Sequence, residues 1–508
     1  MGRIGHGGAQ PGNAARDLAR LLRRSGDLPA WEWYWVQVPL WDTVALAVRP
    51  QSIPLGLPHE LVDWHLGQEA TNGPSTWAPK DMPGYWEHWQ GLCRTIDIDP
   101  SRAEPLSLWA DGVPYTRKHS LFLINMSLRA RQSGKRLPLC AIPTHLLCKC
   151  GTCSGRHTLN AVWEVLAWSL RFAALGRRPI KRHDMSDWLE SDAARAAAGG
   201  QELCRPALLH VIKGDWSMLA LNLGLPKWDS VLGMCWLCKA TPDTFRALGS
   251  QGIQAAAMSS QEFFHQERAR GSIICPLFSA PCVGTWTVAS DWMHACDLGV
   301  GQDLVGGALH HCLQHLPGNS RGQRLANLWA RIQDWYRANR VVTRLNALTL
   351  TMLKVPGKPA KLKSKAAECR CLQPFALHLV ESCLVAHMDS EILQLLKDAL
   401  GALVGLASKA HAVPWPKSEA VLEADLLVQS WVRLEPLDPD TFRVKPKVHQ
   451  ILHIVNSTSD TLGPPGSVWS YAEEDWGGRM VKLFVRRGGR LSVGRGAELL
   501  FNRALALA

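Results

Sequence analysis

The sequence predicts a mixed α/β protein in which a small sheet is interrupted along the chain by a long, mostly helical segment. Three short apolar runs, separated by turn residues, lie between residues 105 and 147, and a fourth ends at Asp215. From about 240 to 440, apolar residues recur at helical spacing instead. Short apolar runs bounded by turn signals favour strands, whereas sustained periodicity of 3.6 residues favours amphipathic helices.

The four apolar runs also predict how the strands connect. The first three, PLSLWADGVPY, HSLFLINMSLRA and KRLPLCAIPTHLL, follow one another at close spacing, which predicts an antiparallel meander. The fourth, which ends HVIKGDW, predicts a buried strand with a helix directly after it. A helix is predicted over 159–175, between the two groups, because its apolar residues have helical spacing and Gly176 closes it.

Helical periodicity is clearest in four stretches of the later chain, at 301–316, 324–339, 371–388 and 390–412. A basic loop at 354–370 interrupts them, with five Lys and one Arg against one Glu. We interpret it as a solvated, mobile loop, with a phosphate-contacting arm as the alternative. By contrast, 68–100 has little periodicity and is predicted to be a long connection.

The length of 508 residues corresponds to about three domains. Composition shifts divide the chain into a partly loose N-terminal region (1–104), a first part of the sheet domain with a cysteine-rich loop (105–239), a helical insertion (240–442) and C-terminal helices that complete the core and carry a basic tail (443–508).

Composition excludes several classes of protein. No run of about 18 apolar residues occurs, so we expect no membrane-spanning helix. The N-terminus lacks the apolar core of a secretion signal, although its arginine-rich, acid-poor character leaves an organelle transit peptide as an alternative. The 15 cysteines are therefore expected to be thiols or metal ligands.

A net charge of +12 is compatible with a polyanionic partner. Most of the 23 Trp are expected to fill the core, with base stacking as the alternative for some.

Three acidic residues stand out by their position in predicted elements. Asp111 lies inside the first apolar run, Asp215 ends the fourth, and Glu474 lies near the start of a late helix. Such acids can converge on one face of a sheet, where carboxylate oxygens suit Mg²⁺ or Mn²⁺. Two of these ions can activate one oxygen of a phosphodiester reaction and stabilise the leaving oxygen. The plain alternative is that each Asp is a cap or a turn former.

Two groups of residues have the chemistry of zinc ligands. One is the CxxC pair of Cys235 and Cys238, which is half of a zinc site. The other, in the segment CKCGTCSGRH, consists of Cys148, Cys150, Cys153 and His157. Free thiols in loops are the alternative for both.

Two further pairs have helical spacing. Asp291 and His294 lie three apart and share one side of a helical turn, where they could bind a metal, join Cys235 and Cys238 as ligands, or pair with each other. His449 and His453 lie four apart, which is also ligand spacing. We favour packing over metal binding for this second pair.

In their order along the chain, these motifs resemble the catalytic region of DDE cut-and-paste transposases. The likeness is to the CACTA-type and Kyakuja–Dileera–Zisupton groups, and more distantly to hAT transposases. It covers about 105–490 and rests on six short motifs: WADGVPY, VIKGDW, the CxxC pair, DWMHACDLG, KPKVHQILH and YAEEDWGG. Each motif is weak alone, and the shared order gives the likeness its specificity.

The resemblance implies a ribonuclease-H-like core split by a helical insertion. Asp111, Asp215 and Glu474 would be the catalytic carboxylates, with Glu473 as the alternative if the register shifts by one. They would bind two Mg²⁺ or Mn²⁺, so that activated water cleaves a phosphodiester and the freed 3′ hydroxyl attacks target DNA. The resemblance further implies DNA as the partner and the nucleus as the location. We expect no membrane partner, since no long apolar run occurs, and no organic cofactor, and a homo-oligomer is left open.

Basic residues would hold the DNA backbone by sequence-independent contacts. The candidates are Lys358, Lys361, Lys363, Lys365, Lys482, Arg486 and Arg487. The chain also departs from the family's pattern, because we recognise no DNA-binding module before residue 105. The alternative is therefore a decayed or domesticated copy, a catalytically inactive zinc protein that binds nucleic acid or another protein.

Overall fold

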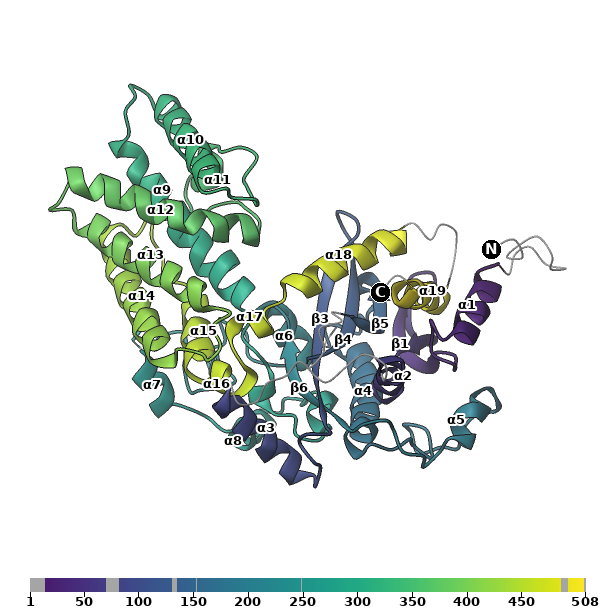
Figure 1. Ribbon diagram of the computed structural model, residues 1–508. Helices are drawn as coiled ribbons and strands as arrows, with labels where there is room; N and C mark the ends of the chain where they lie inside the picture. Colours follow the sequence, from purple (N-terminus) through teal and green to yellow (C-terminus); the bar gives the residue numbers. More distant parts are fainter. Residues whose placement is uncertain are drawn as a thin grey trace. The chain divides into compact units, whose positions relative to one another are not determined.

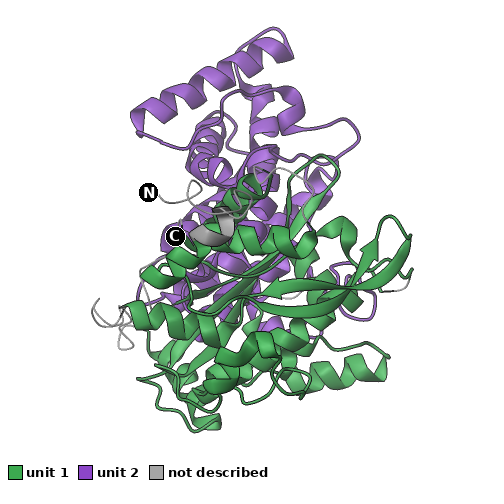
Figure 2. Ribbon diagram, turned by 90° about the vertical axis from the view of Figure 1, so that its right-hand side faces the viewer, with its two compact units in different colours: residues 1–225, 260–288, 470–508 green, residues 226–259, 289–469 purple. Residues whose placement is uncertain are grey.

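The structure is a computed structural model that describes residues 14–69, 82–129, 135–151, 153–247, 249–485 and 492–506. The chain forms two compact units, which Figure 2 distinguishes by colour. Unit 1 consists of residues 1–225, 260–288 and 470–508, and unit 2 consists of residues 226–259 and 289–469.

Unit 1 contains all the strands among the described residues, and several helices (Figure 1). The strands are β1 (Tyr34–Asp42), β2 (Ala47–Leu55), β3 (Glu104–Pro114), β4 (Ser120–Leu128), β5 (Leu137–Pro143) and β6 (Ala207–Lys213). The helices are α1 (Ala14–Ser25), α2 (Pro58–Glu69), α3 (Pro83–Thr95), α4 (Arg156–Leu175), α5 (Ala193–Ala197), α6 (Trp216–Leu223), α8 (Ser260–Ala269), α18 (Tyr471–Val485) and α19 (Val493–Ala506).

The central feature of unit 1 is a four-stranded mixed sheet in the order β5-β4-β3-β6. Strands β3, β4 and β5 form the predicted antiparallel meander, and β6 pairs in parallel with β3. A single parallel bridge, Ile212 to Val288, continues the sheet beyond β6. All seven residues of β5 and of β6 are buried, although both are edge strands of the four-stranded sheet, because α19 packs against β5 and α4 against β6. The α/β class and the four predicted strands are therefore confirmed.

The helix between β5 and β6 follows the sequence closely. α4 carries the apolar periodicity of 159–175 and ends at Gly176, whose φ of +64° is a left-handed C-cap. Glycine adopts this conformation without the steric cost that a side chain would bring. α4 packs against β6 and thereby covers part of the sheet.

Helix α18 packs on the face of β3 that carries Trp109. The Trp109 and Trp476 rings meet edge to face, with centroids 6.3 Å apart. A Cβ added at Gly477 would lie 3.0 Å from the Trp109 ring and 2.9 Å from the side chain of Val113. Glycine at this position therefore lets the helix approach the strand closely.

A buried ion pair joins the same helix to β6. Lys213, at the end of β6, donates to Glu473 Oε1 at 3.2 Å, and Arg136 donates to the same oxygen at 3.2 Å. The Glu473 side chain is only 1% exposed and that of Lys213 only 7%. Because a buried charge without a partner is costly, this pairing fixes how α18 lies on the sheet.

Unit 2 is helical in its described residues, which confirms the helical periodicity predicted for most of 240–440. Its helices are α7 (Ser250–Ala255), α9 (Gln302–Cys312), α10 (Arg321–Ala338), α11 (Leu350–Leu353), α12 (Ala366–Ala386), α13 (Glu391–Lys409), α14 (Lys417–Leu437), α15 (Lys447–His453), α16 (Ser459–Leu462) and α17 (Pro465–Val468). Two π-helical segments, η7 (Met293–Gly301) and η9 (Ile454–Thr458), accompany them.

The basic loop at 354–370 is held in place by its backbone, which differs from the mobile loop that we predicted. Leu362 N donates to Gln302 O at 2.8 Å, and Lys363 N donates to Met352 O at 2.8 Å. Ala360 and Leu362 are buried, and α12 already begins at Ala366. The buried apolar residues anchor the segment, while Lys358, Lys361, Lys363 and Lys365 are exposed.

The prediction of a long connection over 68–100 is wrong for residues 83–95, which form a helix. Residues 70–81 lie outside the described residues. Helix α3 occupies Pro83–Thr95, with Tyr85, Trp89 and Cys93 buried. These three residues lie four apart and pack into one apolar cluster. This spacing is typical of a helix, but the nearby Gly and Pro residues favoured a connection in the sequence-based prediction.

The boundaries of the two units also differ from the boundaries of the four parts predicted from the sequence. The CxxC pair and residues 443–469 belong to unit 2, whereas 260–288 return to unit 1. Six of the largest fully buried side chains are Trp, consistent with core packing as the main use of this residue. None of the described helices is long and apolar enough to cross a membrane.

The buried ion pair predicts a large effect of Lys213→Met on the stability of unit 1. The change removes one of the two cations that contact the buried Glu473 carboxylate, and breaking a buried ion pair costs up to about 3–5 kcal/mol. We expect faster amide exchange in α18 and a lower unfolding midpoint, measured by hydrogen–deuterium exchange and thermal melting. The matched control is Arg479→Met, which breaks the exposed pair with Asp475 and should cost about 0–1 kcal/mol. Equal effects of the two changes would contradict the assignment.

Candidate functional site

The structure brings Asp111 and Asp215 to the same end of two neighbouring parallel strands. The β3–β6 register pairs Trp109 with Lys213, and a Cβ at the following Gly214 would lie 3.2 Å from Ala110 O. Asp111 and Asp215 come directly after these neighbours. Both side chains lie in half-buried positions at the edge of the apolar core.

The two aspartates are positioned by local hydrogen bonds. Asp215 is the N-cap of α6, and its Oδ1 accepts from Met218 N at 2.6 Å. This bond uses one carboxylate oxygen and fixes the direction of the other. Asp111 Oδ1 accepts from Gly112 N at 2.6 Å. The sequence reading of Asp215 as a helix cap is therefore correct, and it remains compatible with a ligand role for Oδ2.

Glu474 lies on α18, the helix that packs against β3. It is half-buried, and its backbone N donates to Ser470 O at 2.8 Å. Residues three and four apart share one face of a helix, so Glu473 and Glu474 both lie one turn before Gly477. Strand alternation places Asp111 on the same face of β3 as Trp109 and Val113, the face that α18 contacts.

The two neighbouring glutamates have different surroundings. Glu473 is fully buried and engaged by Lys213 and Arg136, so its charge is neutralised by the protein itself. Glu474 is half-buried, and its Oε1 atom is shielded from solvent. Of the two registers considered from the sequence, Glu474 therefore remains the candidate ligand and Glu473 has a structural role.

A second cluster forms in unit 2 from Cys235, Cys238, His449 and His453. Their four ligand atoms lie within 4.8 Å of one another, and all four residues are buried. Cys235 Sγ lies 3.3 Å from His453 Nε2, and Cys238 Sγ lies 3.4 Å from His449 Nε2. Four ligands bound at 2.0–2.3 Å around a tetrahedral ion lie about 3.3–3.8 Å apart, so these separations suit zinc.

The cluster has a polar arrangement that a cation would satisfy. The Nε2 atoms of His449 and His453 face each other at 3.1 Å, and two thiols close the group. Facing ring nitrogens cannot both accept, and their lone pairs repel unless a proton or a metal lies between them. The four residues could therefore hold a metal ion such as zinc.

The pKa values of the group follow from burial and its internal hydrogen bonds. Burial raises the pKa of Cys235 and lowers that of His453. The hydrogen bond from Cys235, followed by those from His449 and His453, lowers the pKa of Cys238. A thiolate and neutral imidazoles are the forms that bind zinc.

The cysteine-rich loop of unit 1 forms the other cluster. Cys148, Cys150, Cys153 and His157 also bring their ligand atoms within 4.8 Å of one another. Cys148 Sγ and Cys150 Sγ lie 3.7 and 3.6 Å from His157 Nδ1. The loop turns sharply through Gly151 and Gly155, with φ values of +85° and +87°. These positions let four ligands within ten residues face one point, so this group too could hold a metal.

The third metal candidate from the sequence is placed differently. Asp291 and His294 lie outside the cluster that contains Cys235 and Cys238. They bond to each other instead, since Asp291 Oδ2 lies 2.6 Å from His294 Nδ1 and accepts from His294 N at 3.0 Å. Because Asp291 and His294 lie three positions apart just before and within the first turn of η7, they pair with each other and not with Cys235 and Cys238.

The basic candidates are divided between the two units. Lys358, Lys361, Lys363 and Lys365 are exposed on the segment before α12 of unit 2, and Lys482 is exposed on α18 of unit 1. Arg486 and Arg487 lie outside the described residues.

Neither the family models nor the curated proteins with which the sequence was compared give a match.

Sequence reasoning named both histidines of the buried cluster but favoured packing for them. The signal that could have corrected this is the combination of two half-sites, CxxC and HxxxH, each of which supplies two ligands at the spacing of a structural zinc site. Sequence reasoning missed Lys213 and Arg136, because their role follows only from contact with Glu473 in the folded chain.

Two metal equivalents are predicted for the purified chain, one at each cluster. Cys238→Ser and Cys153→Ser should each lower the bound zinc from about two to about one per chain, measured by inductively coupled plasma mass spectrometry. Cys371→Ser, at a cysteine outside both clusters, is the matched control and should leave the zinc content unchanged. An unchanged zinc content in Cys238→Ser would contradict the unit 2 site.

Proposed function

We propose that this chain is a DDE transposase-type protein that cleaves DNA strands with Asp111, Asp215 and Glu474 as its metal-binding carboxylates. The observation that supports the proposal is the parallel pairing of β3 and β6, because Asp111 and Asp215 each follow by two positions the paired residues Trp109 and Lys213. An antiparallel meander extended by a parallel strand beside its first strand is also the arrangement expected of a ribonuclease-H-like core.

The donor set fits a hard divalent cation. Asp111, Asp215 and Glu474 offer carboxylate oxygens, which Mg²⁺ and Mn²⁺ prefer, and all three side chains are half-buried. The nearby charge of Lys213 is already compensated by Glu473.

Each residue has a distinct part in the proposed reaction. Bound Mg²⁺ would supply activation of the attacking oxygen and stabilisation of the leaving oxygen of a phosphodiester. Asp111 and Asp215 would hold the ions from the sheet, and Glu474 would hold them from the helix. Glu473, Lys213 and Arg136 would act as positioning residues, since they keep α18 on β3.

The zinc clusters would have a structural part in this proposal. The unit 2 cluster joins residues that lie 211 and 218 positions apart, so a bound ion would tie the CxxC loop to α15. All four ligands would be protein side chains, and a zinc ion without an open position stabilises a fold rather than catalysing a reaction.

One observation favours a second candidate function. The cap that Asp215 forms on α6 accounts for its position without any metal. A non-catalytic descendant of a transposase, held together by zinc and bound to nucleic acid, would keep this cap. The two candidates differ in whether Mg²⁺ supports strand cleavage.

Nicking of supercoiled plasmid DNA tests the proposal. In about 5–10 mM Mg²⁺ or Mn²⁺, ions that carboxylate oxygens bind, we expect relaxation of the plasmid by the full chain. Asp111→Asn, Asp215→Asn and Glu474→Gln should each slow nicking by about a hundredfold or more, because a lost metal ligand removes several kcal/mol of transition-state stabilisation.

The matched control for the helix acid is Asp475→Asn, the exposed neighbour of Glu474, which should leave nicking unchanged. Zinc-loaded, folded protein that binds DNA but does not nick it would reject the catalytic proposal in favour of the second candidate. Loss of nicking in Asp475→Asn alone would argue against the assigned register.

A further inference from the structure

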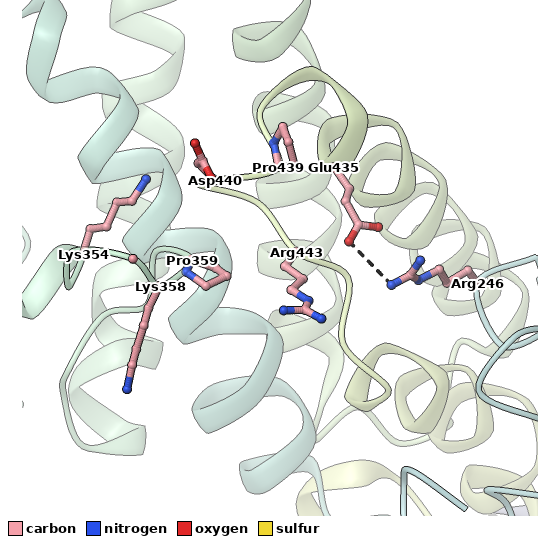
Figure 3. A pocket seen from close by; sticks show the side chains of 9 residues that line it. Arg246, Lys354, Lys358, Pro359, Glu435, Pro439, Asp440 and Arg443 are labelled. Atoms are coloured by element: carbon pink, nitrogen blue, oxygen red, sulfur yellow. Dashed lines mark ion pairs between the residues drawn. The ribbon is translucent and has the colours of Figure 1, made fainter. Parts of the chain in front are cut away.

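A basic hollow lies within unit 2, apart from both cysteine clusters. It has a volume of about 580 Å³. Arg246, the segment Lys354–Pro359, the C-terminal end of α14 and the segment after that helix line it (Figure 3).

The charges in the hollow are unbalanced. Its cationic side chains are Arg246, Lys354, Lys358 and Arg443, against the acids Glu435 and Asp440, a formal excess of two positive charges. Arg246 and Glu435 form an ion pair at 3.6 Å, drawn as the dashed line in Figure 3.

Two of the cations are available to a ligand. Among the described residues, the Lys358 ammonium and the Arg443 guanidinium form no ion pair. In Figure 3 both side chains point the same way, whereas Lys354 points toward the side of Asp440. Lys354 Nζ also donates to Thr441 Oγ1 at 3.3 Å, so it is partly engaged by the protein.

The backbone that carries these cations is fixed. Ala360 N donates to Thr441 O at 3.0 Å and joins the two segments that bear Lys358 and Arg443. Lys361 N donates to Leu353 O at 2.9 Å, and Thr441 N donates to Asp438 Oδ1 at 3.1 Å. Cations on a held backbone lose less conformational freedom on binding than cations on a loose loop.

The cationic surface continues along the chain beyond the hollow. Lys361, Lys363 and Lys365 are exposed, and the intervening Leu362 is buried. This alternation directs the three ammonium groups to the solvent side of one extended segment. A row of like charges that starts at a hollow suits a ligand with repeated negative charges better than a single small anion.

We propose that this hollow binds the phosphate backbone of DNA, with Lys358 and Arg443 each contacting one phosphate and Lys361, Lys363 and Lys365 contacting phosphates further along. The inference rests on the proposed function for its choice of DNA, and it adds Arg443, a residue that no sequence motif marks. The guanidinium can hold phosphate oxygens with two parallel hydrogen bonds, whereas the ammonium acts as a point charge. The shared chemistry is a phosphate group, which a nucleic acid or a free polyphosphate could supply.

The test is fluorescence anisotropy with the full chain and a labelled DNA duplex of arbitrary sequence, between 50 and 200 mM NaCl and without Mg²⁺ so that no cleavage occurs. Each lost phosphate contact lowers the slope of log affinity against log salt by about 0.9. The double variant Lys358→Gln/Arg443→Gln should therefore bind more weakly, with a slope smaller by about 1.8. The control Lys227→Gln/Arg340→Gln removes the same charge from exposed positions of unit 2 outside the hollow and should keep the wild-type slope.

Equal losses in the two double variants, or no loss in either, would overturn the proposal. The proposal would also be overturned if Lys358 and Arg443 were needed to bind inorganic triphosphate but had no effect on the affinity for DNA. The outcome is separate from catalysis: a slope change in a protein that never nicks DNA supports the hollow and rejects the proposed function. Normal nicking with unchanged slopes rejects the hollow alone.

Discussion

The ion pair between Lys213 and Glu473 is the contact on which the arrangement of unit 1 depends. It joins residues 260 positions apart, the end of β6 and the first turn of α18. Because both side chains are buried, the pair does not tolerate a shift of the helix along the sheet. The close approach of Gly477 to Trp109 and Val113 fixes the same helix at a second point. Glu474 therefore lies on a helix whose position is determined by packing and by charge.

The sheet contributes the other half of the candidate site through topology alone. Parallel pairing of β3 and β6 aligns strands that are far apart in the sequence, so residues just beyond Trp109 and Lys213 become neighbours. Gly214 allows this approach, since a side chain there would crowd Ala110 and Met218. The chemistry of two metals needs carboxylates near a common point, and strand ends beside a capped helix supply such positions without a long loop.

The features that could be predicted from the sequence are those set by residues close together in the chain. The meander, β6, α4 and the cap at Asp215 each follow from apolar runs, turn residues and capping chemistry within a few positions. Contacts over long separations could not be read in this way. The pairing of Cys235 with His453 spans 218 residues, and the compensation of Glu473 by Lys213 spans 260. For the same reason Arg443 gave no signal, because its neighbours in the hollow come from distant segments.

The central claim is that Asp111, Asp215 and Glu474 form one metal-binding site. A crystal structure of the chain soaked in Mn²⁺, with anomalous diffraction to locate the ions, tests it most directly. The account predicts two manganese peaks about 3.5–4 Å apart, in contact with all three carboxylates. The account would be contradicted if manganese bound only elsewhere in the chain. It would also be contradicted if the three carboxylates lay too far apart to bind two manganese ions at that spacing.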